Sequence, residues 1–333
     1  MILPVLEVRE PWVFPAAFAV AVAAVLLAGA FLLPLLRRLN FGQRVRDDGP
    51  GRHLSKQGTP TMGGLAFLLA LTGVLLLAVP ATPEIMILLA VTLGAGTLGF
   101  ADDFLKVALR RPLGLRGRDK LVIQMILGAL LGWAAVTFTG RGTSLAVPWL
   151  AGARLELGLL YPAFTAVFLT GSSNAVNLTD GLDGLAAGGT ALAALVFTVA
   201  ALARGQLAVA VSGVALMGVC VGFLWYNFHP ARVFMGDTGS LALGAALAGL
   251  AVVTETELLL VVAGGLFVVE TLSVIVQVMY FRFTGGRRLL RMSPLHHHFE
   301  LMGWSEVTVV LTMWFFQVLC VIAALTGLRG MGV

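Results

Sequence analysis

Ten runs of apolar residues, each long enough to cross a membrane as a helix, divide this chain of 333 residues. About 20 apolar residues in a helix span the hydrocarbon core of a bilayer, and these runs lack the alternation of barrel strands. The sequence therefore predicts an all-α polytopic membrane protein with about ten transmembrane helices, in which residues 1–333 form a single domain. The runs cover residues 12–36, 61–82, 85–101, 121–140, 158–176, 185–203, 206–225, 239–254, 258–281 and 307–328.

The Lys and Arg residues are divided unevenly between the connections. Because successive helices cross in opposite directions, the connections after the first, third, fifth, seventh and ninth runs share one face. All but five of the 22 Lys and Arg residues belong to that face; the others are Arg9, Arg141, Arg154, Arg204 and Arg329. Cytoplasmic connections carry the excess of basic residues, so we expect the basic face in the cytoplasm and both termini outside.

The composition excludes several other classes of protein. With 59% hydrophobic and 12% charged residues, the chain is too apolar for a soluble domain. Its net charge of +5 suits an anionic lipid or a phosphorylated substrate, and no nucleic-acid-binding module is visible, so no nucleic acid partner is expected. Cys220 and Cys320 stand inside apolar runs, without the spacing of a disulfide framework or a metal site.

Two adjacent carboxylates, Asp102 and Asp103, follow the third run. If the helix continues for one more turn, Lys106 lies on the face of Asp102 and favours its ionised form. Adjacent side chains point about 100° apart on a helix, so one carboxylate could take a proton or a metal ion while the other orients a partner. The alternative is a charged stop at the end of a transmembrane helix.

A second set of polar residues, Asn177, Asp180 and Asp183, recurs every three positions after the fifth run, beside Gly181 and Gly184. Asp183 could serve only to cap the sixth helix. That alternative does not account for Asn177 and Asp180, which lie at or near membrane depth, where polar side chains are costly unless they have a partner or a function.

Asp237 and Thr238 open the eighth run, within Gly236-Asp237-Thr238-Gly239-Ser240, and Asn227 and His229 precede them in the same connection. Free N–H groups at a helix N-terminus favour phosphate, and a neighbouring carboxylate could hold Mg²⁺ against it. The alternative is that these residues only cap the helix.

Three consecutive histidines, His296, His297 and His298, lie in the last connection of the basic face. A zinc site is disfavoured because successive side chains diverge and no second His/Cys cluster exists. Contact with phosphate, beside Arg287 and Arg288, suits them better.

The first connection of the basic face, residues 52–64, supplies Lys56, Thr61 and a Gly-rich entry to the second run. This also suits an anionic substrate, although basic residues there could be orientation signals only.

Together these residues bring carboxylates, cations and histidines to one membrane surface. Phosphoryl transfer requires such a set, because its transition state spreads negative charge over oxygens that must be neutralised and aligned. A membrane location implies that one substrate is a lipid phosphate. A transporter is the alternative from another class, since Glu270 lies inside the ninth run; against it, the acidic residues gather at one surface and no inverted repeat is visible.

The motifs resemble those of the polyprenyl-phosphate N-acetylhexosamine-1-phosphate transferases. Asp-Asp-x-x-Lys at 102–106 and Asn-x-x-Asp-Gly-x-Asp-Gly at 177–184 are typical of that superfamily. Pro-Leu-His-His-His-Phe-Glu at 294–300, followed by Gly303-Trp304, is typical of its phospho-N-acetylmuramoyl-pentapeptide transferase branch.

The resemblance implies transfer of phospho-MurNAc-pentapeptide from UDP-MurNAc-pentapeptide to undecaprenyl phosphate, giving lipid I and UMP in peptidoglycan biosynthesis, with Mg²⁺ as cofactor. It implies a multi-pass homodimer in the bacterial cytoplasmic (inner) membrane, with periplasmic termini and an active site that faces the cytoplasm. It also implies a bent ninth helix, which would give Glu270 an interior setting.

Roles for individual residues follow from the matching positions. Asp102 and Asp103 belong to the catalytic centre, where one deprotonates the lipid phosphate; Asp237 is the metal-binding carboxylate, and His296 lies near the phosphates. The expected substrate-binding residues are Lys56, Thr61, Lys106, Lys120, Asn177, Asp180, Asp183, Asn227, His297 and His298.

Two questions stay open within this resemblance. A sister enzyme would use UDP-GlcNAc, although the triple-histidine motif argues against it. The reaction is either a direct attack by the lipid phosphate or passes through a covalent intermediate on Asp102 or Asp103. We favour direct attack, because an aligned phosphate is already a competent nucleophile.

Overall fold

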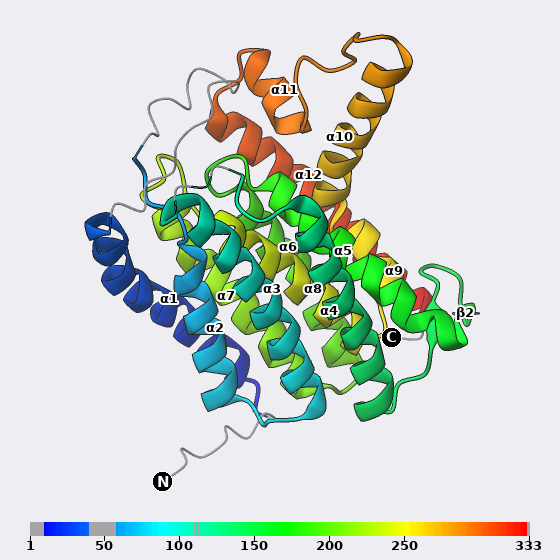
Figure 1. The fold of residues 1–333 in the computed structure, drawn as a ribbon. Coiled ribbons are helices and arrows are strands. Elements are labelled where there is room, and N and C mark those ends of the chain that lie inside the picture. The colour runs from blue at the N-terminus through cyan, green and yellow to red at the C-terminus, as the bar shows by residue number, and fades with distance from the viewer. Residues whose placement is uncertain (1–9, 40–57, 110, 112, 332–333) are drawn as a thin grey trace.

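The computed structural model describes residues 10–39, 58–109, 111 and 113–331, which fold almost entirely into α-helices (Figure 1). The long helices are α1 (Val13–Arg38), α2 (Gly64–Ala78), α3 (Pro83–Val107), α4 (Gly117–Phe138), α5 (Tyr161–Thr179), α6 (Leu185–Ala203), α7 (Leu207–Asn227), α8 (Gly236–Val253), α10 (Gly265–Phe283) and α12 (Glu306–Gly330). The short elements are α9 (Glu257–Ala263), α11 (Leu295–Leu301), a 3₁₀ turn (Gly158–Leu160) and the antiparallel strands β1 (Ser144–Ala146) and β2 (Arg154–Glu156).

Eight of the described helices are long and apolar enough to cross a membrane: α1, α3, α4, α6, α7, α8, α10 and α12. Helix α2 is apolar but has only 15 residues. Helix α5 is more polar, because its second half carries Ser172, Ser173, Asn174 and Asn177. Every apolar run in the sequence contains a helix, so the predicted all-α polytopic fold is confirmed.

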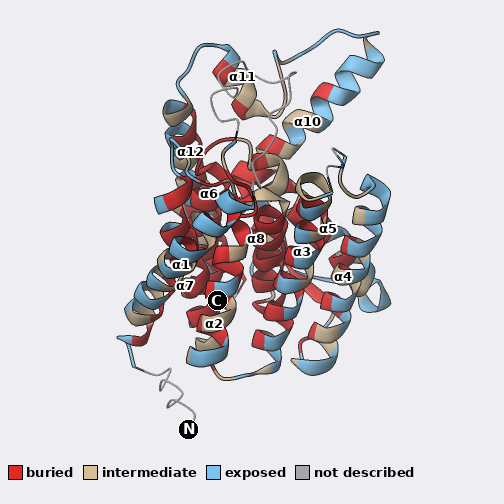
Figure 2. Cartoon of the chain, turned by 60° about the vertical axis from the view of Figure 1, so that its left-hand side comes forward, coloured by how far each residue is buried: buried red, intermediate tan, exposed pale blue. Residues whose placement is uncertain are grey.

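Helix α8 lies at the centre of the bundle and is buried over most of its length (Figure 2). Its many glycines and alanines let neighbouring helices approach closely. Gly244 lies against the backbone of Ser173 in α5, and Gly99 of α3 lies against the carbonyl of Asp237 at the start of α8. Helices α3 and α5 are therefore held next to α8.

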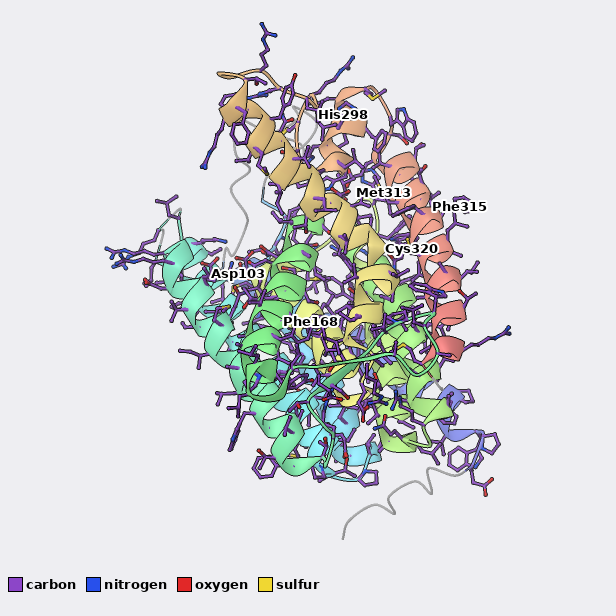
Figure 3. All side chains as sticks on the ribbon, turned by 90° about the vertical axis from the view of Figure 1, so that its right-hand side faces the viewer. Asp103, Phe168, His298, Met313, Phe315 and Cys320 are labelled. Atoms are coloured by element: carbon purple, nitrogen blue, oxygen red, sulfur yellow. The ribbon has the colours of Figure 1, made fainter. Side chains whose placement is uncertain are left out.

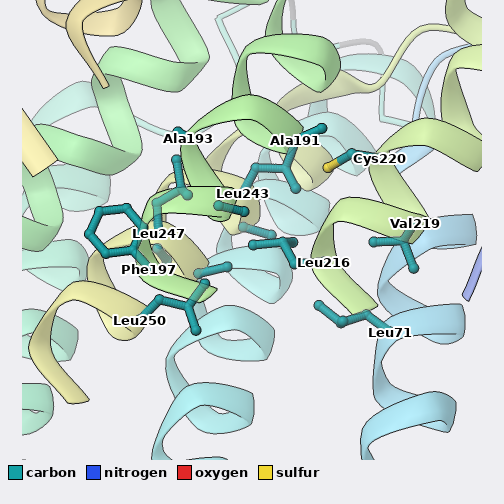
Figure 4. Close-up of a cluster of buried hydrophobic side chains, with 14 of the residues drawn as sticks. Leu71, Ala191, Ala193, Phe197, Leu216, Val219, Cys220, Leu243, Leu247 and Leu250 are labelled. Carbon is teal, nitrogen blue, oxygen red and sulfur yellow. The ribbon is translucent and has the colours of Figure 1, made fainter. Parts of the chain in front are cut away.

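Larger apolar side chains fill the space between α6, α7 and α8 (Figure 4). Phe197, Leu216 and Leu247 come from these three helices, and each is at most 2% exposed. In a membrane such contacts stabilise the bundle through van der Waals packing, since lipid tails are as apolar as the side chains.

The ninth apolar run forms two helices, α9 and α10, that are separated at Gly264. Gln317 of α12 satisfies backbone groups at this break: its side-chain oxygen accepts the N–H of Leu266 (3.1 Å), and its amide donates to the carbonyl of Ala263 (2.5 Å). Helix α10 then projects beyond the bundle (Figure 1). The bent ninth helix that the resemblance implies is present, and Glu270 is fully buried.

The connections form polar clusters at opposite ends of the bundle. At one end the connections after α3, α5 and α7 meet α11, as the motifs predicted. At the other end Arg141 pairs with the buried Glu257 (2.5 Å), and Arg154 and Arg204 lie 3.3 and 3.7 Å from Glu255. Helix α1 begins and α12 ends toward this second end, away from α11 (Figure 1).

Candidate active site

Three helices meet at the start of α8 because glycines allow direct backbone contact. Gly64 of α2 lies against Gly239 of α8, and Gly99 of α3 lies against the carbonyl of Asp237; a Cβ at Gly64 or Gly99 would overlap these atoms. The N–H of Gly64 also donates to the carbonyl of Met235 (3.0 Å). These contacts fix the position of Asp237 relative to α2 and α3.

Asp103 on α3 caps the N-terminus of α8. Its Oδ1 accepts the N–H of Asp237 (3.2 Å), and its Oδ2 accepts the N–H (2.9 Å) and the hydroxyl (2.7 Å) of Thr238. The first N–H groups of a helix have no partner inside the helix, and a carboxylate there interacts favourably with the helix dipole. The N–H groups of Asp237 and Thr238 are therefore not free for phosphate, contrary to what the sequence suggested, because Asp103 occupies them.

Asp102 contacts a different set of groups, although it is adjacent in sequence. Its Oδ2 lies 2.5 Å from Nζ of Lys106, and its Oδ1 accepts the N–H of Leu115 (2.8 Å). Gly114 lies beside this carboxylate, where a Cβ would crowd it. The predicted contact between Asp102 and Lys106 is confirmed, and it explains why α3 continues to Val107, past the apolar run that ends at residue 101.

Asp237, in the first turn of α8, lies between two lysines and an amide. Its Oδ2 is 2.6 Å from Nζ of Lys120 and 3.1 Å from Nζ of Lys106. Its Oδ1 accepts a hydrogen bond from Nδ2 of Asn177 (2.9 Å). The lysines come from α4 and α3 and the amide from α5, so three helices stabilise the negative charge of Asp237.

Asp102, Asp103 and Asp237 form a group that suits a divalent cation. Each offers a carboxylate oxygen, and these oxygens lie within 4.8 Å of one another. The buried Oδ2 of Asp102 has no hydrogen bond of normal geometry within the described residues. If all three are ionised, their charge exceeds that of Lys106 and Lys120, and carboxylate oxygens are the ligands that Mg²⁺ prefers. The donor set therefore fits magnesium.

Asp180 follows α5 as its C-terminal cap residue. Burial, and then the negative charge of Asp237, raise the pKa of its carboxyl well above the ordinary value. Desolvation disfavours the charged form of an acid, so Asp180 keeps its proton to a higher pH than an aspartate in water. It differs in this respect from Asp237, which two lysines accompany.

Asp183 and Asn227 tie the connection between α7 and α8 to the start of α6. Oδ2 of Asp183 accepts the N–H of Ala231 (3.0 Å) and lies 3.1 Å from Nδ1 of His229. Oδ1 of Asn227 accepts the N–H of Gly184 (3.1 Å). Gly184, not Asp183, occupies the cap position of α6, so the reading of Asp183 as a helix cap is wrong.

His297 and His298 point to separate partners. Nδ1 of His297 lies 2.8 Å from Oε2 of Glu300, in the next turn of α11. Nδ1 of His298 accepts the N–H of Arg291 (3.1 Å), at the outer end of the molecule (Figure 3). Within the described residues these two histidines belong to no group of three or more potential metal ligands.

His296 is the histidine that faces the other motifs. It is fully buried, and its ring lies against Gly181, where a Cβ would overlap Nε2. The structure thereby brings α11 onto the segment between Asn177 and Asp183.

Two further predicted residues lie in the entry to α2. Thr61 is buried, and its hydroxyl lies next to Gly236 at the start of α8, because a Cβ added to this glycine would be 3.0 Å from the hydroxyl oxygen. Lys56 lies outside the described residues.

Sequence reasoning missed several polar residues in these contacts. Ser240 accepts a hydrogen bond from Asn177 (2.8 Å), and Oε1 of Glu306, on α12, accepts the N–H of Asp183 (2.8 Å). Gln277 of α10 accepts two N–H groups from the connection that follows that helix (3.0 and 2.9 Å). The available signal was a single polar residue within or beside an apolar run, which is also found at sites with no function.

Carboxylates and lysines gathered at one end of a helical membrane bundle are typical of transferases that handle phosphate-linked groups. Residues 85–255 match the family model of Glycosyl transferase family 4. Residues 56–68 match signature 1 of the phospho-N-acetylmuramoyl-pentapeptide-transferases. Curated proteins named phospho-N-acetylmuramoyl-pentapeptide-transferase are similar over nearly the whole chain. The one from Moorella thermoacetica is 55% identical (92% of this chain, 95% of the relative), that from Desulforamulus reducens 53% (91% and 92%) and that from Geobacillus kaustophilus 50% (90% and 92%). This chain belongs to the phospho-N-acetylmuramoyl-pentapeptide-transferase family, which confirms the resemblance drawn from the motifs.

Proposed function

We propose that this protein transfers phospho-MurNAc-pentapeptide from UDP-MurNAc-pentapeptide to undecaprenyl phosphate, with release of UMP and formation of lipid I for peptidoglycan. The names of its relatives support this activity. The observation that carries the chemistry is Asp237, held between Lys106 and Lys120 beside Asp102 and Asp103. Catalysis of phosphoryl transfer is mostly positioning and neutralisation of charge, and this group supplies both.

In the proposed reaction an oxygen of undecaprenyl phosphate attacks the phosphorus that carries the sugar. A new P–O bond forms, and the bond from that phosphorus to the oxygen shared with the uridine-bearing phosphate breaks. The electron pair leaves on UMP. Lys106 and Lys120 lie where they can neutralise charge on the phosphate oxygens, and no covalent bond to the enzyme is needed.

Asp102, rather than Asp103, is our candidate for the proton acceptor. Both oxygens of Asp103 hold the first turn of α8. Oδ2 of Asp102 lies 2.5 Å from Nζ of Lys106 and makes no hydrogen bond that holds α8 among the described residues. A proton from the attacking lipid phosphate would pass to this oxygen, while Asp103 keeps Asp237 in place.

Mg²⁺ would be held by Asp237, next to the carboxylates of Asp102 and Asp103. When bound, it neutralises negative charge on the diphosphate. The spacing of the three carboxylates supports this assignment.

The remaining expected site residues are proposed to contact the substrates around this centre. His296 belongs beside the phosphates, because it lies against Gly181. The proposed contacts of the sugar nucleotide are Lys56, Thr61, Asn177, Asp180, Asp183, Asn227, His297 and His298.

We further propose ten membrane crossings in a single domain, with both termini in the periplasm. Helices α2 and α5 would add two crossings to those of the longer apolar helices, and α9 with α10 would make one. The Lys and Arg excess on the α11 side supports a cytoplasmic active site in the bacterial inner membrane. A homodimer is proposed on the family resemblance alone.

Release of UMP by the detergent-purified protein tests the proposal. We expect release only with both UDP-MurNAc-pentapeptide and undecaprenyl phosphate, and only with Mg²⁺. Release with UDP-GlcNAc in place of the muramoyl substrate would move the protein to the sister branch. A cooperative thermal unfolding transition would show that the purified protein is folded. If such protein releases no UMP with either donor, the transferase function is refuted.

A further inference from the structure

Glu270 is a fully buried carboxylate in an apolar helix. Such a group is costly at membrane depth unless other groups satisfy it. Its position depends on the break at Gly264, because the break sets the direction in which α10 leaves the bundle, and Glu270 on α10 then contacts the first turn of α11. Neighbouring groups must therefore satisfy this carboxylate.

Both oxygens of Glu270 contact one residue, His296. Oε1 lies 3.2 Å from the backbone N of His296 and accepts its N–H, and Oε2 lies 3.1 Å from Nδ1 of the imidazole ring. The first contact holds the backbone at the start of α11, and the second places a carboxylate oxygen beside Nδ1 of the ring. A single carboxylate therefore lies against both the backbone and the imidazole of this residue.

The far side of the ring has a different environment. Neither ring nitrogen of His296 has a hydrogen bond of normal geometry within the described residues, but Nδ1 lies 3.1 Å from a carboxylate oxygen of Glu270, whereas the buried Nε2 lies against Gly181. A proton on Nε2 would have no acceptor there, and an unsatisfied buried donor costs about 1–3 kcal/mol. A proton on Nδ1 faces a carboxylate oxygen. The surroundings thus favour the tautomer with hydrogen on Nδ1.

We propose that Glu270 is a positioning residue that keeps the proton of His296 on Nδ1 and presents an unprotonated Nε2 to the segment 177–183. The inference rests on the proposed function in one respect, namely that His296 is part of the reaction site. The tautomer itself does not depend on turnover.

The tautomer is measured by nitrogen NMR on protein labelled with [¹⁵N]histidine. The chain has five histidines, so the signals of His296 are assigned by their loss in His296→Gln. We expect a protonated Nδ1 and a bare Nε2. A protonated Nε2 with a bare Nδ1 in the wild-type protein would overturn the proposal.

Glu270→Gln inverts this preference. The glutamine oxygen still accepts the N–H of His296, so its NH₂ group faces Nδ1 and donates to it, and the ring proton moves to Nε2; an Asp→Asn change behind a catalytic histidine has this consequence in serine proteases. Glu270→Asp keeps the acceptor and retains the wild-type tautomer. The control is Ser273→Ala in the same helix. Its hydroxyl donates to the carbonyl of Glu270 (2.6 Å) and not to the carboxylate, so its removal should leave the tautomer unchanged.

A double-mutant cycle on UMP release tests the link to turnover. Glu270→Gln is expected to lower kcat by about 10- to 100-fold, the range found for partners that orient functional histidines, with little change in KM. In a His296→Ala background it should have no further effect. Losses that multiply in the double variant would contradict a role through His296. If the wild-type protein releases no UMP, the proposed function fails, while the NMR result still decides the tautomer.

Discussion

Asp102 and Asp103 are adjacent in sequence, yet they contact different parts of the molecule. Asp103 makes three hydrogen bonds to the first turn of α8, whereas Asp102 contacts Lys106 and the N–H of Leu115. That the two side chains point in different directions follows from helix geometry and was predictable. The sequence could not show which of them holds α8, because Asp237 and Thr238 lie more than 130 residues further along the chain.

This difference predicts opposite effects of two matched substitutions. Asp103→Asn places an amide NH₂ near the N–H groups of α8 and should lower the free energy of unfolding by about 1–3 kcal/mol. Asp102→Asn should leave stability nearly unchanged but lower turnover by about 10²- to 10⁴-fold, the usual contribution of a general base. Thermal unfolding in detergent and UMP release separate the two. Equal losses of stability would contradict the division of roles.

Asp237→Asn is expected to lower turnover by at least about 10²-fold, because it removes charge that Lys106, Lys120 and a metal ion require. The concentration of Mg²⁺ that gives half-maximal activity should rise. The control is Asp119→Asn in α4, a half-exposed carboxylate that contacts Arg118 (3.4 Å); it should leave both quantities unchanged. Full activity of Asp237→Asn would remove this residue from the mechanism.

At the level of the elements, the close contact between α3 and α8 depends on a missing side chain. A Cβ at Gly99 would overlap the carbonyl of Asp237, at the point where the two helices bring their carboxylates together. The packing of α3 against α8 therefore also determines how close their carboxylates lie. A shift of one helix against the other would separate Asp103 from Thr238.

Gly99→Ala should destabilise the protein by about 1–3 kcal/mol, the usual cost of overpacking, and reduce UMP release. The matched control is Gly73→Ala in α2, where nothing lies within 4 Å of the added Cβ. Alanine should be neutral or stabilising there by up to about 1 kcal/mol. The two melting temperatures check this, and a stable, active Gly99→Ala variant would show that α3 and α8 can separate without loss.

The helices themselves were largely predictable, because membrane length and the absence of charge mark them in the sequence. The runs at 185–203 and 206–225 match α6 and α7 within two residues at each end. The break in the ninth run was expected only from the family resemblance, since Gln317 stabilises it from another helix. In the same way, the short contacts of Asp183 with Ala231 and of His296 with Glu270 depend on tertiary structure. Spacing could place these residues at one end of the bundle but could not pair them.

At the scale of the whole molecule, the two ends of the bundle have different electrostatic character. At the α11 end, three carboxylates and two lysines surround a position that fits a metal ion. At the opposite end, Arg141, Arg154 and Arg204 are paired with Glu257 and Glu255. Lys106 and Lys120 at the first end contact the carboxylate of Asp237, whereas the three arginines of the second end are paired with neighbouring glutamates.

Single cysteines test the proposed orientation in the membrane. Each cysteine is introduced into a background without Cys220 and Cys320. Gly142→Cys lies at the Arg141 end of the bundle. Arg118→Cys lies at the other end, where the native Arg118 side chain is 76% exposed. On intact cells, a maleimide that does not cross membranes should label Gly142→Cys and reach Arg118→Cys only after lysis. The reverse pattern would invert the topology.

The pairing of Arg141, Arg154 and Arg204 also bears on where the product goes. A lipid diphosphate formed at the carboxylate end carries its charged head group at that leaflet. At the far end these three guanidinium groups already have carboxylate partners, so they offer the head group little attraction. With the proposed site and orientation, we expect synthesis and transbilayer movement to be separate events, in which the product forms within one leaflet and its transfer to the other side needs its own driving force.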